Sequence, residues 1–209
     1  MSKIQEVKAM VEAGKSKLVP GLVQEALDEG RAPTEILQAM VDSMSVVGEK
    51  FSAGDIFVPE MLVAAKAMSK GVDVLKPLMA GDRSNALGTC VIGTVAGDLH
   101  DIGKNLVSMM IESAGFEMVD LGVDVSAESF VQAVKDNDNV KIVACSGLLT
   151  TTMPALKETV ATVKAAYPAV KVIVGGAPVT PAYATEVGAD GYAPDAGSAA
   201  VKAKELVTA

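Results

Sequence analysis

Hydrophobic and polar residues follow a helical period in the first 80 residues of the chain. Apolar residues recur at spacings of three and four, as in Ile4, Val7 and Val11, and this spacing is typical of amphipathic helices. Glycines stand where these helices would end, and prolines stand where two of them would begin. The pattern predicts about four helices, at roughly residues 2–13, 15–29, 33–51 and 59–79.

From residue 87 onward the pattern changes to short β-rich runs that alternate with helical segments. Such alternation predicts a parallel, doubly wound sheet, whose ligands bind beyond the carboxyl ends of the strands. The strands are predicted at roughly residues 89–95, 117–122, 141–147, 171–176 and 189–193, and the helices at 103–114, 126–137, 153–166, 180–187 and 196–207.

The chain is therefore predicted to be an α/β protein with two domains. An N-terminal bundle of about four helices, residues 1–85, precedes a five-stranded parallel sheet of the Rossmann-like or flavodoxin-like type, residues 86–209. The segment GDRSN at 81–85 has lost the helical period and carries turn-forming residues, so we expect the linker there.

Composition and charge exclude several classes of protein. Half of the 209 residues are hydrophobic, which allows a sizeable core, and the formal net charge is −8. Without a basic surface we expect no binding to nucleic acid or to a membrane. No stretch approaches the roughly 20 uncharged apolar residues that span a bilayer, and the charged N-terminus lacks the apolar core of a signal peptide. We expect a soluble cytoplasmic protein.

The two cysteines, Cys90 and Cys145, both lie inside apolar runs and far apart in the sequence. A metal-binding pair or a disulfide framework favours short spacings or an oxidising compartment. Free cysteine is among the residues most often found buried, so we expect both side chains to pack as small hydrophobic groups.

The loop after the first predicted strand, residues 97–103 (GDLHDIG), carries the only histidine, His100. Asp98 can point to the same side and accept a proton from one imidazole nitrogen, which leaves the other nitrogen free for a metal. Gly103 lets the chain turn into a helix without obstructing a bulky ligand. Zinc prefers three or four protein ligands, but the chain has no second histidine and no cysteine close to His100 in the sequence. If His100 binds a metal, we therefore expect a macrocycle to supply the remaining ligands. The alternative is a hydrogen-bonded surface histidine.

Two further loops follow predicted strands at the same edge of the sheet. Ser146 and the hydroxyls of Thr150 and Thr151 could bind a carboxylate or a ligand, whereas Thr152 is expected to cap the next helix. Gly175 and Gly176 have no side chains, so a flat group could approach the backbone closely. An ordinary strand-to-helix turn explains these two glycines equally well.

The three loops together resemble the signature of cobalamin-binding domains. The matching residues, in order, are Asp98-x-His100-x-x-Gly103, Ser146-x-Leu148 and Gly175-Gly176. Residues 47–51 (VGEKF) and 54–60 (GDIFVPE) are also similar to the helical cap of methyl-transferring corrinoid proteins. This family includes the cobalamin-binding region of methionine synthase and the corrinoid proteins of methanol, methylamine and methoxyl-compound methyltransferase systems.

The resemblance implies a role for each of these residues. His100 would be the lower axial ligand of cobalt in place of the cofactor's own base, Asp98 would hydrogen-bond His100, and Ser146 would support Asp98 in a relay. Phe51 and Val58 would cover the upper face of the corrinoid. The full cofactor-binding set implied is Asp98, Leu99, His100, Asp101, Ile102, Gly103, Ser146, Leu148, Thr150, Gly175, Gly176, Phe51 and Val58.

The same resemblance implies a carrier that cycles between methylcob(III)alamin and cob(I)alamin and has no complete reaction of its own. Its partners would be a substrate-specific methyltransferase, a second methyltransferase that passes the methyl group to tetrahydrofolate or a thiol, and an ATP-dependent reactivase. Three other functions are weighed against it. These are the small subunit of an adenosylcobalamin-dependent mutase, a corrinoid-based sensor, and a flavodoxin-like binding module without cobalt.

Overall fold

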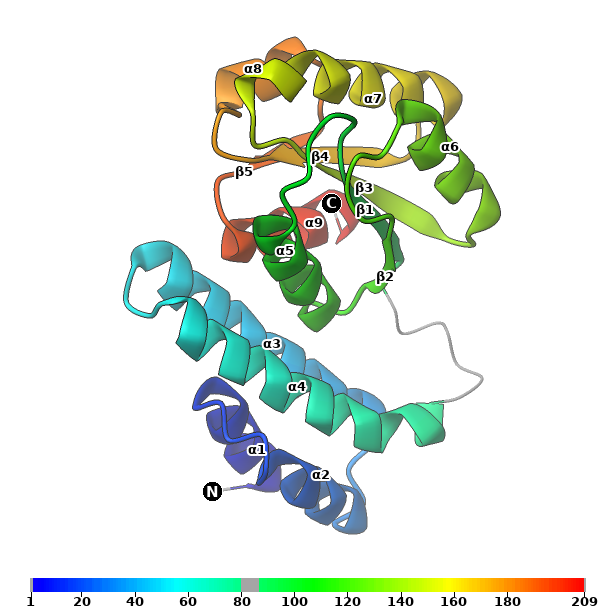
Figure 1. Ribbon diagram of the computed structural model, residues 1–209. Helices are drawn as coiled ribbons and strands as arrows, with labels where there is room; N and C mark the ends of the chain where they lie inside the picture. Colours follow the sequence, from blue (N-terminus) through cyan, green and yellow to red (C-terminus); the bar gives the residue numbers. More distant parts are fainter. Residues whose placement is uncertain (1, 80–86, 209) are drawn as a thin grey trace. The chain divides into compact units, whose positions relative to one another are not determined.

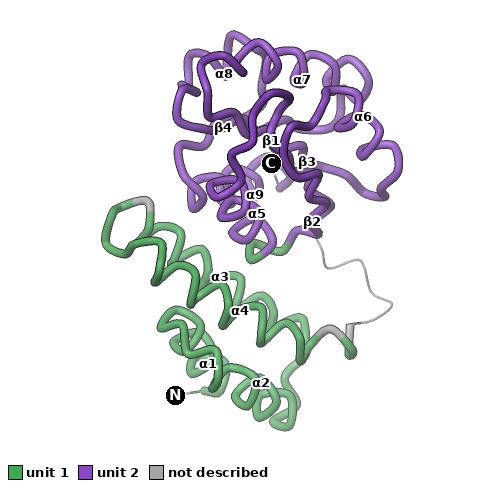
Figure 2. Tube along the Cα trace, in the orientation of Figure 1, with its two compact units in different colours: residues 1–86, 113–115 green, residues 87–112, 116–209 purple. Residues whose placement is uncertain are grey.

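The computed structural model describes residues 2–79 and 87–208, which fall into two compact units (Figure 2). Helices α1 to α4 form the first, here called the helical unit. The sheet and its helices form the second, the α/β unit, apart from residues 113–115, which group with the first. The linker expected at 81–85, and with it the domain boundary after residue 85, lies outside the described residues.

The helical unit consists of the four helices that the hydrophobic period predicted. They are α1 (Lys3–Glu12), α2 (Val19–Asp28), α3 (Pro33–Ala53) and α4 (Val58–Met79). α1 and α4 each pack against both α2 and α3. The core between them is aliphatic and rich in methionine, with fully or nearly fully buried side chains of Val7, Val11, Val23, Ile36, Met40, Met44, Met61 and Leu75.

The second helix begins later than the sequence pattern predicted, at Val19 rather than near residue 15. Pro20 explains the difference, because proline has no N–H and its ring would clash with a carbonyl one turn earlier. Proline is best tolerated in the first turn of a helix, and Pro20 occupies that position. At the end of α3, Gly54 adopts a left-handed conformation with φ of 81° and terminates the helix as expected.

The α/β unit contains a five-stranded sheet in which every pairing is parallel, as the sequence predicted. The strands lie in the order β2-β1-β3-β4-β5, which is the flavodoxin-like order. Their bounds are Thr89–Thr94 for β1, Glu117–Asp120 for β2, Val140–Ser146 for β3, Lys171–Gly175 for β4 and Gly191–Ala193 for β5.

Helices cover both faces of this sheet (Figure 1). On one face lie α6 (Ala127–Asp136), α7 (Met153–Ala166) and α8 (Pro181–Glu186), and on the other lie α5 (Ile102–Ser113) and α9 (Ala196–Thr208). The core on the first face joins side chains of the strands to those of α6 and α7, including Val91, Val143, Val174, Phe130, Leu156 and Val160. Burial on both faces explains why the strands read as nearly continuous apolar runs.

The connection of the strands determines where loops meet. The chain leaves β1 to form β2 on one side and later returns to form β3 on the other side of β1. Thr94 at the end of β1 is paired with Ser146 at the end of β3. The loops that follow β1 and β3 therefore leave the sheet side by side, at the point where ligands bind in doubly wound sheets.

Both cysteines are free and buried, as expected from the sequence. Burial raises the pKa of the Cys90 thiol far above its usual value, and burial raises the pKa of Cys145 to about 12. The thiolate is the reactive form of cysteine, so neither side chain is suited to redox or nucleophilic chemistry in the folded chain.

The folded protein should therefore resist a thiol reagent such as Ellman's reagent at a pH of about 8. We expect both thiols to react promptly once urea has unfolded the chain, and variants Cys90→Ala and Cys145→Ala assign the signal. Rapid release of the chromophore from either thiol in the folded protein would contradict this burial.

Candidate functional site

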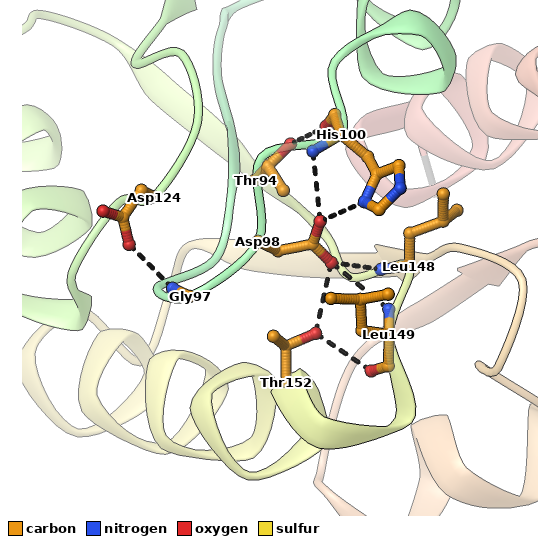
Figure 3. Close-up of polar contacts among 8 residues, drawn as sticks. All are labelled: Thr94, Gly97, Asp98, His100, Asp124, Leu148, Leu149 and Thr152. Atoms are coloured by element: carbon orange, nitrogen blue, oxygen red, sulfur yellow. Dashed lines mark hydrogen bonds and ion pairs between the residues drawn. The ribbon is translucent and has the colours of Figure 1, made fainter.

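The loop after β1 turns sharply at Gly97, which has φ of 81°, and then presents Asp98 and His100. Three backbone positions of the loop are held by hydrogen bonds. The Thr94 hydroxyl donates to the His100 carbonyl at 2.8 Å. Asp124, in the connection between β2 and α6, accepts from the Gly97 N–H at 2.7 Å and donates its own N–H to the Asp98 carbonyl at 3.0 Å. The loop is thus a fixed support (Figure 3).

His100 and Asp98 form a direct pair, as the sequence predicted. Nδ1 of His100 lies 2.7 Å from Oδ1 of Asp98, and the His100 backbone N–H donates to the same oxygen at 3.1 Å. The Asp98 side chain is fully buried, whereas the imidazole is 51% exposed. The histidine is therefore fixed at one nitrogen and open to solvent over the rest of its ring.

The second carboxylate oxygen of Asp98 binds the loop that follows β3. Oδ2 accepts from the Leu148 N–H at 2.6 Å and more weakly from the Leu149 N–H at 3.3 Å. The Thr152 hydroxyl lies 3.2 Å from the same oxygen and 2.9 Å from the Leu149 carbonyl. One buried carboxylate thus joins the loops after β1 and β3 (Figure 3).

The support expected from Ser146 comes from Thr152 instead. Among the described residues, no hydrogen bond joins the Ser146 side chain to Asp98, since Ser146 is the last residue of β3 and the chain must advance further to reach the carboxylate. The sequence also predicted that the Thr152 side chain caps α7, but its hydroxyl makes no capping hydrogen bond to that helix. A hydroxyl has one proton, and here the Leu149 carbonyl and Asp98 share it.

The hydrogen bonds to Asp98 decide its protonation. Burial by itself raises the pKa of Asp98, but the Leu148 N–H, the His100 ring, the His100 N–H and the Thr152 hydroxyl outweigh burial and lower the pKa to about 2. Asp98 is therefore ionised at neutral pH and can only accept hydrogen bonds. Nδ1 of His100 must then carry a proton, which leaves the lone pair of a neutral imidazole at Nε2.

The surroundings of the imidazole are apolar and open. Leu99 and Ile102 are 72% and 78% exposed, and Leu148 and Leu149 are also exposed. A side chain added at Gly103 would meet no atom within 4 Å. Exposed apolar side chains gathered around one polar group are typical of a binding surface for a large, partly apolar ligand.

The two glycines at the end of β4 serve the fold directly. Gly176 has φ of 126°, and a Cβ atom there would lie 2.0 Å from the Gly147 carbonyl oxygen. A Cβ atom at Gly175 would lie 2.9 Å from the Ala193 carbonyl oxygen. Both residues must be glycine so that the loop after β4 can pass close to the loop after β3 and to β5. Their expected contact with a ligand stays a prediction, as do the contacts expected of the exposed Asp101 and Thr150.

Phe51 and Val58 belong to the helical unit, where Phe51 is half-buried on α3 and Val58 is the first residue of α4. Phe57, for which no role was predicted from the sequence, directly precedes Val58 and is 69% exposed. Exposed Leu62 and Val63 follow within the next turn and a half of α4. The role of Phe51 and Val58 as a cover for a corrinoid stays a prediction.

The residues present fit a corrinoid better than a protein-bound metal ion. Among residues 2–79 and 87–208, no three His, Cys, Asp or Glu side chains are arranged to hold a metal. One oriented imidazole nitrogen remains, in an open apolar setting. A macrocycle that supplies its own equatorial nitrogens needs only such an axial ligand from the protein.

The pKa of Asp98 predicts a pH-dependent contribution to stability. Because the pKa of this carboxyl is lower in the folded chain, its stabilisation is full above a pH of about 4 and declines as the pH falls toward 2. We expect Asp98→Asn to lower the free energy of unfolding by about 2 kcal/mol at pH 7 and by roughly half as much at pH 3.

Urea unfolding of the apoprotein at both pH values measures this difference. The exposed neighbour Asp101, changed to asparagine, is the matched control and should leave the free energy of unfolding nearly unchanged. An equal loss in Asp98→Asn at the two pH values would show that the ionised carboxylate is not the stabilising form.

Comparisons with known proteins agree with this geometry. Two families, each described as "B12 binding domain", match residues 88–201 and residues 3–76. Dimethylamine corrinoid protein 1 of Methanosarcina acetivorans is 42% identical over 208 residues, which cover 98% of this chain and 97% of that protein. A trimethylamine corrinoid protein of Methanosarcina barkeri is 42% identical over 193 residues, covering 90% and 88% of the two chains.

Solved structures give the same result. A cobalamin-binding protein from Desulfitobacterium hafniense superposes with a TM-score of 0.83 at 32% identity, over 97% of this chain and 98% of that one. The methanol:cobalamin methyltransferase complex MtaBC from Methanosarcina barkeri contains a chain that superposes with a TM-score of 0.83 at 29% identity, over 99% and 80% of the two chains. The matches extend across both units, helical and α/β, and the chain belongs to the B12-binding corrinoid proteins that carry methyl groups in methyltransferase systems.

Proposed function

We propose that this corrinoid protein binds the cobalt of cobalamin through Nε2 of His100, in place of the cofactor's own base. The observation that carries the proposal is the 2.7 Å contact between Nδ1 of His100 and Oδ1 of the buried Asp98. It fixes the ring and its tautomer and directs the remaining lone pair away from the carboxylate.

Each neighbouring residue then has a physical task. Leu99 and Ile102, on either side of His100 and Asp101 in the sequence, offer apolar surface to the lower face of the corrin. The loops at 146–150 and 175–176 lie beside the strand ends, where we expect them to receive the displaced nucleotide tail. When bound, cobalamin supplies the cobalt that accepts and gives up the methyl group.

The Asp98–His100 pair also provides a place for a proton. Nε2 has one lone pair and can hold either a proton or a metal, but not both. When Nε2 binds metal, that proton must leave. The strength of axial ligation is thereby coupled to proton uptake at one nitrogen of this chain.

We further propose that the methyl donor is a methylated amine. This rests on the dimethylamine and trimethylamine corrinoid proteins, which are about as long as this chain and align with most of it at 42% identity. The carrier would accept the methyl group from an amine-specific methyltransferase and deliver it to a second methyltransferase that uses tetrahydrofolate or a thiol. An ATP-dependent reactivase would restore oxidised cobalt.

A single isotope substitution tests the axial ligand, because His100 is the only histidine in the chain. Protein with ¹⁵N-labelled histidine is loaded with cobalamin in its paramagnetic cobalt(II) form, and the electron paramagnetic resonance spectrum is recorded. We expect the superhyperfine splitting to change from the triplet caused by ¹⁴N to the doublet caused by ¹⁵N, because the axial nitrogen comes from the protein.

A triplet that persists in the labelled protein would mean that the cofactor's own base remains on cobalt, and the proposal would be wrong. His100→Ala is the matched variant and should lose the doublet. Added imidazole should then restore a nitrogen signal, since the substitution leaves space for the missing ring.

Affinity capture from the native host tests the partners and the donor. We expect the tagged chain to recover a methyltransferase whose eluate demethylates dimethylamine or trimethylamine. The His100→Ala chain should recover the same protein without supporting methyl transfer, because it lacks the axial ligand but keeps its surface. Recovery of an activity specific for methanol, or of no methyltransferase, would contradict the amine proposal.

The cellular location stays an expectation from the sequence. In the described ranges 2–79 and 87–208, no helix has both the length and the apolar content needed to cross a bilayer. The cytoplasmic location and the lack of nucleic-acid partners remain predictions from the acidic composition.

A further inference from the structure

We propose that Asp124 is a positioning residue that orients the Asp98–His100 pair from outside the cobalamin signature. The inference extends the function proposed above, since it concerns how the same pair is held. Asp124 lies in the connection between β2 and α6, and the sequence analysis gave no sign that it takes part in the site.

Asp124 binds two consecutive residues of the loop that carries the pair. Its Oδ1 accepts the Gly97 N–H at 2.7 Å, and its own N–H donates to the Asp98 carbonyl at 3.0 Å. These bonds act on the backbone on either side of the Gly97–Asp98 link. They set the direction in which the Asp98 side chain leaves the backbone, independently of its contacts with the loop after β3.

The two bonds continue a hydrogen-bonded ladder beyond the end of the sheet. The Thr94 N–H donates to the Gly122 carbonyl, and the Val125 N–H donates to the Thr94 carbonyl, both at 3.0 Å. Val95 and Val125 form an isolated parallel bridge. Asp124 therefore lies between Gly122 and Val125, both of which are hydrogen-bonded to Thr94. Its carboxylate extends this pairing to Gly97, which lies beyond the bridge at Val95.

The backbone of Asp124 is also in an uncommon conformation. Its φ is 55°. Among the described residues other than glycine, only Asn139 also has a positive φ. This left-handed conformation is unfavourable for most residues and is best tolerated by glycine, asparagine and aspartate. Asparagine would keep both the conformation and a side-chain acceptor, whereas glycine would keep the conformation and lose the acceptor.

That difference separates positioning from stability. Asp124→Gly should fold, because glycine adopts this backbone without strain, but the Gly97 N–H loses its partner. Asp124→Asn should preserve the bond to Gly97. The matched control is Asn139→Gly, because Asn139 is the other non-glycine residue with a positive φ among those described. It lies in the turn before β3, and no described hydrogen bond joins it to residues 97–100.

The readout is the tautomer of His100 in the protein without cobalamin, observed by NMR of ¹⁵N-labelled histidine at a pH of about 8.5, where an ordinary imidazole is neutral. With one histidine in the chain, the spectrum contains a single imidazole. We expect wild type, Asp124→Asn and Asn139→Gly to show the tautomer protonated at Nδ1. We expect Asp124→Gly to show a mixture of both tautomers.

The affinity for cobalamin should follow the tautomer. Loss of an outer partner of a metal ligand weakens metal binding by about 10- to 100-fold. We expect Asp124→Gly to weaken cobalamin binding by about 10-fold, the lower end of this range, and Asp124→Asn to keep the wild-type affinity. If circular dichroism shows that the glycine variant is unfolded, Asp124→Ala is the second variant without the acceptor. Asn139→Ala then controls for the strain of alanine in a left-handed conformation.

A folded variant without the acceptor that keeps the Nδ1 tautomer and binds cobalamin within about twofold of wild type would overturn the proposal, because outer partners normally matter more than this. The NMR readout contains no cobalt. Its result therefore stands apart from the isotope test of axial ligation, and either proposal can fail without the other.

Discussion

The site depends on one buried carboxylate that is kept ionised. The Asp98 side chain is completely buried, and a buried negative charge is costly unless hydrogen bonds replace the lost water. Backbone N–H groups, the imidazole and a hydroxyl provide those bonds. Because they converge from the loops after β1 and β3, the same atoms that stabilise the charge also join the two loops and aim His100 outward.

The parallel sheet makes this convergence possible. Strand order places β1 between β2 and β3, so the loop after β1 has a neighbour on each side. On one side, the loop after β3 holds the carboxylate of Asp98 through Leu148 and Thr152. On the other side, the connection after β2 holds the backbone of the loop through Asp124. A histidine supported from two directions is suited to ligate a metal with little reorganisation.

Function in this chain is divided between a rigid pair and an open surface. The pair determines which imidazole nitrogen is available, whereas Leu99 and Ile102 leave apolar surface exposed around it. The cysteines, which could have suggested redox chemistry, are buried, and burial raises the pKa of both thiols. Chemical reactivity is thus left to the cofactor, and the protein supplies an oriented imidazole and an exposed apolar surface.

The sequence by itself determined the helices, the parallel sheet and the Asp98–His100 pair, because periodicity and residues two apart in one loop are local properties. The tertiary structure alone decided which hydroxyl reaches Asp98. Thr152 and Ser146 are equally plausible by type, and only the path of the chain after β3 brings Thr152 close. Asp124 is 27 residues from Gly97 in the sequence, and only strand order makes them neighbours, since a contact between distant segments has no local pattern to reveal it.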